Sequence, residues 1–246
     1  MAESSDIAQN FNKISSEIDA AVRLCKRNPD SVRLIVVTKG QSVERVASVI
    51  NAGAKFLGEN YPEETVEKMA GLGSRKTMVE WHMIGHLQSR KAALVLEHFD
   101  FFHALDSRKL AEKLNRSLEG KGTLLKVLLQ YNVGGEDSKF GWLADQTLKW
   151  PTLIKDFEYI LQLKNLKICG IMVMSPFTNN KSQSRFYFEK TRMLRDFFQG
   201  RYSEIQMDQL SMGTSHDFIE AIAEGATFLR IGTAIMGDRD YPKGLR

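Results

Sequence analysis

The chain has 246 residues, of which 43% are hydrophobic and 26% charged, and its formal net charge is +4. This composition is ordinary for a folded protein, and no apolar run is long enough to cross a bilayer. The polar start "MAESSDIAQNF" lacks the pattern of a secretory signal, and the basic residues are scattered. We therefore expect a cytoplasmic protein that binds neither nucleic acid nor membrane, although a mild positive excess also suits a phosphorylated small molecule.

The first predicted element is a long helix. Apolar residues recur at steps of three and four from Ile7 to Cys25, and the turn residues Asn28-Pro29-Asp30 predict its end. The two cysteines, Cys25 and Cys169, form no CxxC pair and fall on this apolar stripe and inside an apolar strand. We expect both to be core thiols in a reducing compartment.

Short apolar runs then alternate with amphipathic segments along the rest of the chain. Eight runs typical of strands begin near Leu34, Lys55, Glu80, Phe101, Leu125, Lys167, Ile205 and Thr227. Strands that alternate with helices form a parallel sheet, and eight such units in this length are typical of a (β/α)8 barrel. The competing open, doubly wound sheet normally carries a GxGxxG turn after its first strand, which "VVTKGQ" lacks. We predict a single TIM-type barrel domain over residues 1–246, with the opening helix as an extra element.

Lys39 is the first candidate for chemistry, because it follows directly on the buried first strand "LIVVT". Active sites of such barrels lie at the carboxyl ends of the strands. A lysine there is often simply solvated. In a partly desolvated mouth, however, burial lowers the pKa of an amine and leaves a nucleophile able to form a Schiff base.

The last two strands supply a candidate anion site. The seventh ends in "LSMGTSHD" and the eighth in "RIGTAIMG", which place small and hydroxyl residues before two predicted helices. Barrels often hold phosphate with these two loops, and backbone amides at a helix start favour an anion. The alternative is that Ser211 to Ser215 only cap the helix that follows. Arg230 interrupts the eighth strand and must find an ion-pair partner or an anion.

Three further patterns are weaker. His82 and His86 are four residues apart, but the first lies in a predicted strand, so we expect no metal site. The "GEN" stretch, residues 58–60, ends the second strand and is a candidate lining of the mouth. Glu63, Glu64 and Glu67 have the pattern of a solvated helix face.

Together these segments resemble the pyridoxal phosphate (PLP) homeostasis proteins, whose fold is the alanine racemase N-terminal barrel, PLP fold type III. The resemblance rests on "VVTK", "GEN", "WHMIGHLQSRK", "HALDSRKLAEKLN", "NVGGEDSKFG", "CGIMVMSP" and "LSMGTSHDFIEAIAEGATFLRIGTAIMG". It implies that PLP is held as a Schiff base on Lys39 and that Arg230 faces the pyridine nitrogen. It also implies phosphate contacts from Ser211, Gly213, Gly232 and Thr233, with Asn60, His82 and Met212 near the ring.

Two positions depart from the family pattern. The family often has a second lysine and a proline shortly after the Schiff-base lysine, where this chain has Gly40-Gln41-Ser42. It also commonly has methionine at the position of Thr214. The first departure concerns the mouth, and the second adds a hydroxyl beside the phosphate loop.

The resemblance leaves the activity open between classes. The first expectation is a non-catalytic monomer that stores PLP and delivers it to PLP-dependent apoenzymes. The second is a weakly active PLP-dependent amino-acid racemase, although racemisation needs two opposed bases and Lys39 supplies one. In the racemases that this barrel resembles, the other base comes from an additional domain. A third class is a barrel enzyme that acts on a phosphorylated metabolite without a cofactor.

Overall fold

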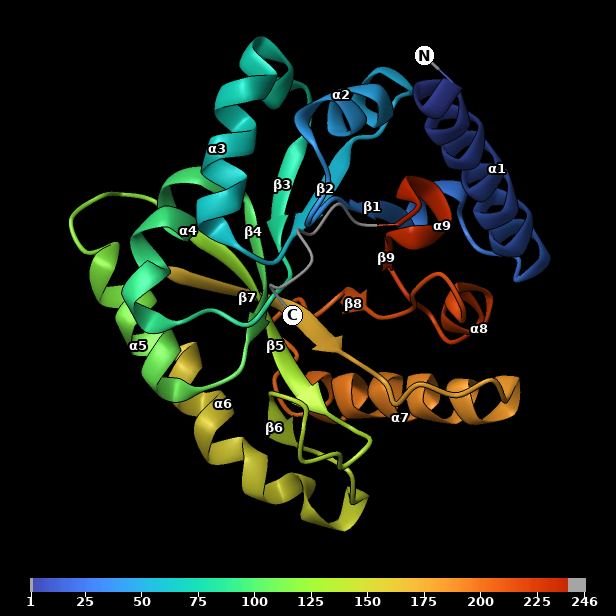
Figure 1. Cartoon of the computed structure of the whole chain (residues 1–246). Coiled ribbons are helices and arrows are strands. Elements are labelled where there is room, and N and C mark those ends of the chain that lie inside the picture. Colours follow the sequence, from blue (N-terminus) through green and yellow to red (C-terminus); the bar gives the residue numbers. More distant parts are fainter. Residues whose placement is uncertain (1, 239–246) are drawn as a thin grey trace.

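The computed structural model describes residues 2–238, with side chains from residue 6 onward, and contains the predicted barrel (Figure 1). Every strand pairing in it is parallel. The strands are β1 (Arg33–Val37), β2 (Phe56–Glu59), β3 (Glu80–Met83), β4 (Phe101–Leu105), β5 (Leu125–Asn132), β6 (Trp142–Leu143), β7 (Leu166–Val173), β8 (Gln209–Ser211) and β9 (Phe228–Ile231).

Eight of these nine strands close the barrel, in the order β1-β2-β3-β4-β5-β7-β8-β9, with β9 pairing back onto β1. The ninth, β6, is a two-residue strand that pairs with the end of β5 at Tyr131 and Asn132. The prediction missed β6 because two residues carry no periodic signal. The seventh barrel strand begins at Gln209 rather than near Ile205, since a turn joins Ile205 back to Tyr202.

Helices surround the barrel, and helix α1 lies outside this ring against α2, α8 and α9 (Figure 1). None of the described helices combines the length and apolarity needed to cross a membrane. The α-helices are α1 (Ala2–Leu24), α2 (Val43–Asn51), α3 (Pro62–Leu72), α4 (Ala92–His98), α5 (Arg108–Ser117), α6 (Ile154–Leu161), α7 (Lys181–Gln199), α8 (Phe218–Ala223) and α9 (Thr233–Met236). Short 3-10 helices are η1 (Pro29–Ser31), η2 (Gly73–Met78), η3 (Ser89–Lys91) and η4 (Thr147–Leu153).

The predicted apolar stripe of α1 is confirmed, because Ile7, Ile14, Ile18 and Val22 are buried against the rest of the molecule. Cys25, which ends the stripe, is only half-buried, and so is Cys169. The expectation of two fully buried thiols was therefore wrong. Each thiol packs at the edge of the core rather than within it.

Alternation along each strand decides which residues face the barrel interior. On β1 this alternation turns Arg33 and Val37 to the interior, with Lys39 in step just beyond the strand. Because Arg33 begins the strand, it lies at the amino end of the barrel, whereas Val37 and Lys39 lie at the carboxyl end. The other face of each strand packs against the surrounding helices, so β4 is buried along its whole length. The carboxyl ends of the strands thus bring residues from distant parts of the chain to one mouth.

Candidate functional site

A cavity of about 600 Å³ opens at the carboxyl ends of the barrel strands. Lys39, Asn60, Arg230, Gly232 and Thr233 line it, as the sequence predicted for the mouth. A volume in this range is typical of pockets that bury a cofactor or a small ligand. The cavity is therefore the candidate site, and each wall can be traced to its strand.

Lys39 lies in a tight turn between β1 and α2. Gly40 has φ +68°, a left-handed conformation that glycine adopts without strain. Ser42 caps α2 by accepting a hydrogen bond from the amide of Arg45, and the Gln41 side chain accepts one from Arg45 Nε at 2.6 Å. The three residues that depart from the family pattern thus build a well-bonded turn behind Lys39.

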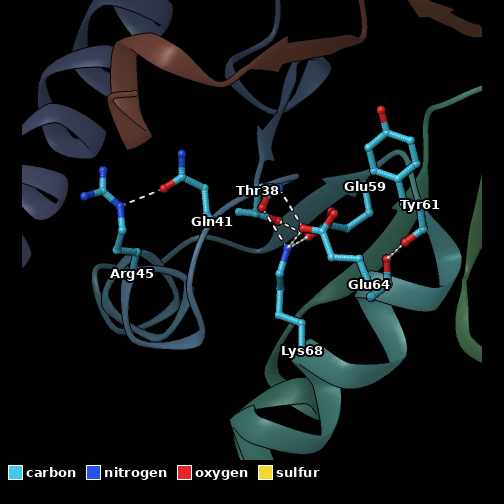
Figure 2. A network of polar contacts seen from close by, with 9 residues as sticks. Thr38, Gln41, Arg45, Glu59, Tyr61, Glu64 and Lys68 are labelled. Atoms are coloured by element: carbon cyan, nitrogen blue, oxygen red, sulfur yellow. Dashed lines mark hydrogen bonds and ion pairs between the residues drawn. The ribbon is translucent and has the colours of Figure 1, made fainter. Parts of the chain in front are cut away.

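A buried network holds the backbone on both sides of Lys39 (Figure 2). Lys68 Nζ, on α3, donates to the carbonyl oxygen of Thr38 at 2.8 Å. On the other side, Glu64 Oε1 accepts a hydrogen bond from the amide of Gly40 at 2.6 Å. Lys68 Nζ also lies 3.1 Å from Glu64 Oε1, so one ion pair ties the two anchors together. We name Lys68, Glu64 and Glu59 the clamp.

Glu59 is the fully buried member of the clamp. Its Oε1 accepts from Lys68 Nζ at 2.5 Å and from Thr38 Oγ1 at 2.7 Å. Burial raises the pKa of Glu59, and the opposing charge of Lys68 partly offsets this rise. Glu59 thus faces α3 rather than the mouth, and of the polar pair in "GEN" only Asn60 lines the cavity. Glu64 is half-buried and belongs to this network, which corrects the expectation that it lies on a solvated helix face, whereas Glu63 and Glu67 are exposed as expected.

Arg230, on β9 next to β1, also lines the cavity and is 5% exposed. Its Nη1 donates to Ser211 Oγ at 2.5 Å, and its Nη2 donates to the carbonyl oxygen of Val173 at 2.8 Å. Nη2 also contacts the sulfur of Met174 at 3.2 Å. Burial lowers the pKa of Arg230 to about 10, which still leaves it charged at neutral pH. A guanidinium has five N–H donors, and these contacts engage three at most.

A chain of hydrogen bonds runs from Arg230 down into the barrel. His103 Nδ1 lies 2.9 Å from Ser211 Oγ, and His103 Nε2 lies 2.9 Å from His82 Nδ1. A guanidinium only donates, so Ser211 Oγ accepts from Arg230, and among the described residues His103 Nδ1 is the other partner of this oxygen. The buried hydroxyl of Ser211 is fully satisfied when it donates its hydrogen to His103 Nδ1. His103 then carries its hydrogen on Nε2 and donates to His82. The network therefore assigns the remaining hydrogen of His82 to Nε2.

The loops after β8 and β9 form one end of the cavity, where Thr214, Ser215, Gly232 and Thr233 line it. The first amides of α9, which begins at Thr233, lack a carbonyl partner within the helix. In the other loop, Asp217 Oδ1 accepts from both the amide and the hydroxyl of Thr214, at 2.7 and 3.0 Å. The hydroxyl that distinguishes this chain from the family pattern is thus tied back to its own loop.

Four residues predicted for the cofactor do not line the cavity in the described part of the chain: His82, Ser211, Met212 and Gly213. His82 lies deeper in the barrel, where it packs edge-on against Phe101 with ring centroids 5.6 Å apart. Ser211 and Met212 are fully buried, and Ser211 acts through Arg230. Gly213 has φ +93°, and a side chain there would lie 2.6 Å from Ala221 Cβ, so packing requires this glycine.

Sequence reasoning missed several residues at the mouth. His86 and Phe140 line the cavity and stack on each other, with ring centroids 3.8 Å apart and an interplanar angle of 8°. His86 Nδ1 also lies 2.6 Å from Asp106 Oδ2. Within the described residues no group of three or more His, Cys, Asp or Glu is arranged to hold a metal ion. His82 and His86 face different regions, as the strand between them predicted.

Comparisons with known proteins place this geometry in a family. The alanine racemase N-terminal domain model matches residues 9–240. A curated relative from Vibrio alginolyticus, "Pyridoxal phosphate homeostasis protein", is 37% identical over 96% of this chain and 99% of its own length. The structure of PipY from Synechococcus elongatus with PLP bound has a TM-score of 0.80 at 32% identity, covering 94% of this chain and 100% of PipY.

A further solved structure, of an unknown protein from Bifidobacterium adolescentis, has a TM-score of 0.85 at 31% identity, covering 95% of this chain and 96% of that one. The matches thus extend over nearly the whole chain and over nearly the whole length of these relatives. The chain therefore belongs to the alanine racemase N-terminal domain family and, within it, to the pyridoxal phosphate homeostasis proteins.

Proposed function

We propose that this barrel domain binds PLP at its mouth and serves PLP homeostasis as a carrier that stores and releases the cofactor. The observation that carries the proposal is that Lys39 and Arg230 line one cavity together with the loops after β8 and β9. PipY, which matches 94% of this chain, has a structure with PLP bound. The curated relatives are named for PLP homeostasis rather than for an enzymatic activity.

The residues at the mouth fit the parts of PLP one by one. Gly232 and Thr233, with the loop of Thr214 and Ser215, present small residues and amides suited to a phosphate. Arg230 keeps N–H donors for the pyridine nitrogen. Because a guanidinium does not give up its proton at neutral pH, this nitrogen accepts a hydrogen bond and stays unprotonated.

Lys39 supplies the primary amine. When bound, PLP supplies an aldehyde that condenses reversibly with such an amine, which allows both storage and release. The clamp fixes the backbone on both sides of Lys39 and so aims this amine into the cavity. Gly40 and the Gln41–Arg45 contact support the same turn from behind.

The first test is the absorption spectrum of the purified chain after incubation with PLP, followed by borohydride reduction and peptide mapping by mass. We expect a yellow protein with one reduced adduct, on Lys39. Lys39→Ala should abolish the adduct. Lys91→Ala is the matched control, because Lys91 lines the same cavity from η3, and it should leave the adduct in place. A colourless protein, or an adduct on Lys91, would contradict the proposal.

The carrier role is tested separately from binding. The PLP-loaded protein is incubated with α-deuterated amino acids, and loss of the label is followed. A carrier should show no more exchange than Lys39→Ala. It should also transfer PLP to a PLP-dependent apoenzyme at a rate set by its own release of PLP. Exchange well above that of Lys39→Ala would identify an enzyme instead.

A further inference from the structure

A second cavity, of about 200 Å³, lies at the opposite end of the barrel, where the strands begin. The two cavities are separated along β1, because Arg33 at the start of this strand lines the lower cavity, whereas Val37 and Lys39 at its other end line the mouth. The proposed PLP function makes no use of this end. The residues that matter for its chemistry are Arg33, His82, Lys126, Lys167, Cys169 and Gln209.

Two buried polar atoms at this cavity lack a hydrogen-bond partner among the described residues: His82 Nε2 and Gln209 Oε1. His82 is 1% exposed, and its other ring nitrogen is engaged by His103. The hydrogen-bond chain from Arg230 makes His82 Nε2 a donor. The nearest carboxylate oxygen, Glu80 Oε2, is 3.9 Å away and too distant to accept from it. A buried donor that stays unsatisfied destabilises the folded state, and among the described residues His82 Nε2 has no acceptor. An acceptor from outside the chain would satisfy it.

The charges around the cavity favour an anion as that acceptor. Arg33, Lys126 and Lys167 lie at its rim, and within residues 2–238 no carboxylate comes within 4 Å of their charged nitrogens. Two carboxylates, Glu80 and Asp208, also line the cavity, so three cations face two anions. Burial and the nearby Arg33 and Lys126 lower the pKa of His82 to about 3, which keeps its ring neutral at pH 7.

The size of the cavity limits the ligand. At about 30 Å³ for each water molecule, this volume holds about six waters, which is below the range for drug-sized ligands. The two unpartnered atoms require different groups on the ligand: His82 Nε2 donates and needs an acceptor, and Gln209 Oε1 accepts and needs a donor. A small oxyanion that keeps one hydroxyl group meets both needs.

We propose that the lower cavity is a binding site for a small oxyanion with a hydroxyl group, of which hydrogen phosphate is the simplest. Its oxygens accept from His82 Nε2 and from the cations at the rim, and its hydroxyl donates to Gln209. The proposed site does not require PLP to bind at the mouth.

Cys169 provides a local probe, because it is half-buried and lines the lower cavity. In a Cys25→Ser background, Cys169 is the only thiol of the chain. Its rate of alkylation by iodoacetamide is measured while inorganic phosphate is titrated at constant ionic strength. We expect saturable protection, and we expect acetate, which has no hydroxyl group, to protect with a midpoint at least about tenfold higher, as for one lost hydrogen bond.

Lys126→Ala should raise the phosphate midpoint about tenfold, whereas Lys109→Ala, an exposed control on α5, should leave it unchanged. The midpoint is compared rather than the basal alkylation rate, because the charge of Lys126 lowers the pKa of Cys169 and its removal changes the reactivity of the thiol. As a second readout, the Nε2 proton of His82 in 15N-histidine-labelled protein should shift with the same midpoint. No protection up to about 100 mM phosphate, or an equal midpoint in Lys126→Ala, would overturn the proposal. An equal midpoint for acetate would do the same.

Discussion

Lys68 Nζ lies 2.8 Å from the carbonyl oxygen of Thr38, the residue directly before Lys39. A lysine of α3 thus positions the lysine at the mouth of the barrel. Lys68 has no contact with the cavity, and its role passes through the backbone.

Replacement of Lys68 by methionine removes the amine and keeps the length of the side chain. Loss of one partner of a buried ion pair costs about 3 to 5 kcal/mol, because the other charge stays buried and unpaired. We expect Lys68→Met to lower the free energy of unfolding by this amount, measured by urea titration. It should also slow the formation of the PLP colour, since the Lys39 turn loses an anchor.

The matched control is Lys181→Met, which removes an ion pair with Glu220 in which Lys181 is 81% exposed. Exposed pairs contribute about 0 to 1 kcal/mol, so the control should be nearly as stable as the parent and should bind PLP at the parent rate. A loss for Lys68→Met no larger than for Lys181→Met would show that the clamp is not a stabilising network.

Arg230→Glu places an acceptor where, in the proposed PLP site, the pyridine nitrogen would meet a donor. We expect this nitrogen to become protonated, with a changed absorption maximum and a new pH titration of the PLP-bound protein. Arg230→Lys is the conservative control, because it keeps a cation that can donate, and it should retain the parent spectrum. Both variants are compared at equal PLP occupancy. An unchanged spectrum and titration in Arg230→Glu would place the arginine outside the ring contact.

The two barrel histidines predict a loss of stability in acid. Burial lowers the pKa of His82 to about 3 and lowers the pKa of His103 well below its usual value of 6.5. In the unfolded chain both rings take up protons below about pH 6.5, whereas the folded chain does not, so stability falls as the pH falls. From pH 7 to pH 5 each ring should cost about 2 kcal/mol.

We expect His103→Gln to reduce this loss of unfolding free energy by the contribution of one histidine ring, measured by urea unfolding at each pH. Glutamine keeps a donor and an acceptor for Ser211 and His82. The control His98→Gln replaces a partly exposed imidazole on α4 by the same amide and should keep the pH dependence of the parent. Identical pH dependence in His103→Gln and the parent would mean that His103 is protonated in the folded state.

The phosphate group should dominate the affinity for PLP. Pyridoxal, which lacks it, should bind at least about 100-fold more weakly, which corresponds to the loss of one or two hydrogen bonds to a charged group. Thr233→Val should weaken PLP binding and leave pyridoxal binding unchanged, because the proposed site assigns Thr233 to the phosphate alone. Equal affinities for PLP and pyridoxal would show that the loops after β8 and β9 do not hold the phosphate.

The architecture and the principal residues of the mouth could be predicted because they follow from local patterns. Alternating strands and helices predicted the barrel, and the barrel fixes the carboxyl ends of its strands as the mouth. Four of these residues follow a predicted strand, namely Lys39, Asn60, Gly232 and Thr233, and Arg230 lies within the last strand. Their meeting in one cavity needed only the rule that parallel strands end on the same side.

The supports behind these residues were decided by tertiary structure. Lys68 lies among the polar residues of an amphipathic helix, and the spacing of apolar residues does not distinguish it from its exposed neighbours. It is buried because α3 packs against β2 where the Glu59 side chain points away from the barrel interior. His103 and Ser211 are more than a hundred residues apart and bond only because the barrel closes. The sequence by itself thus determined the barrel and five of the residues that line its mouth. The closed barrel decided which buried charges and rings hold them there, because those contacts depend on packing between distant segments.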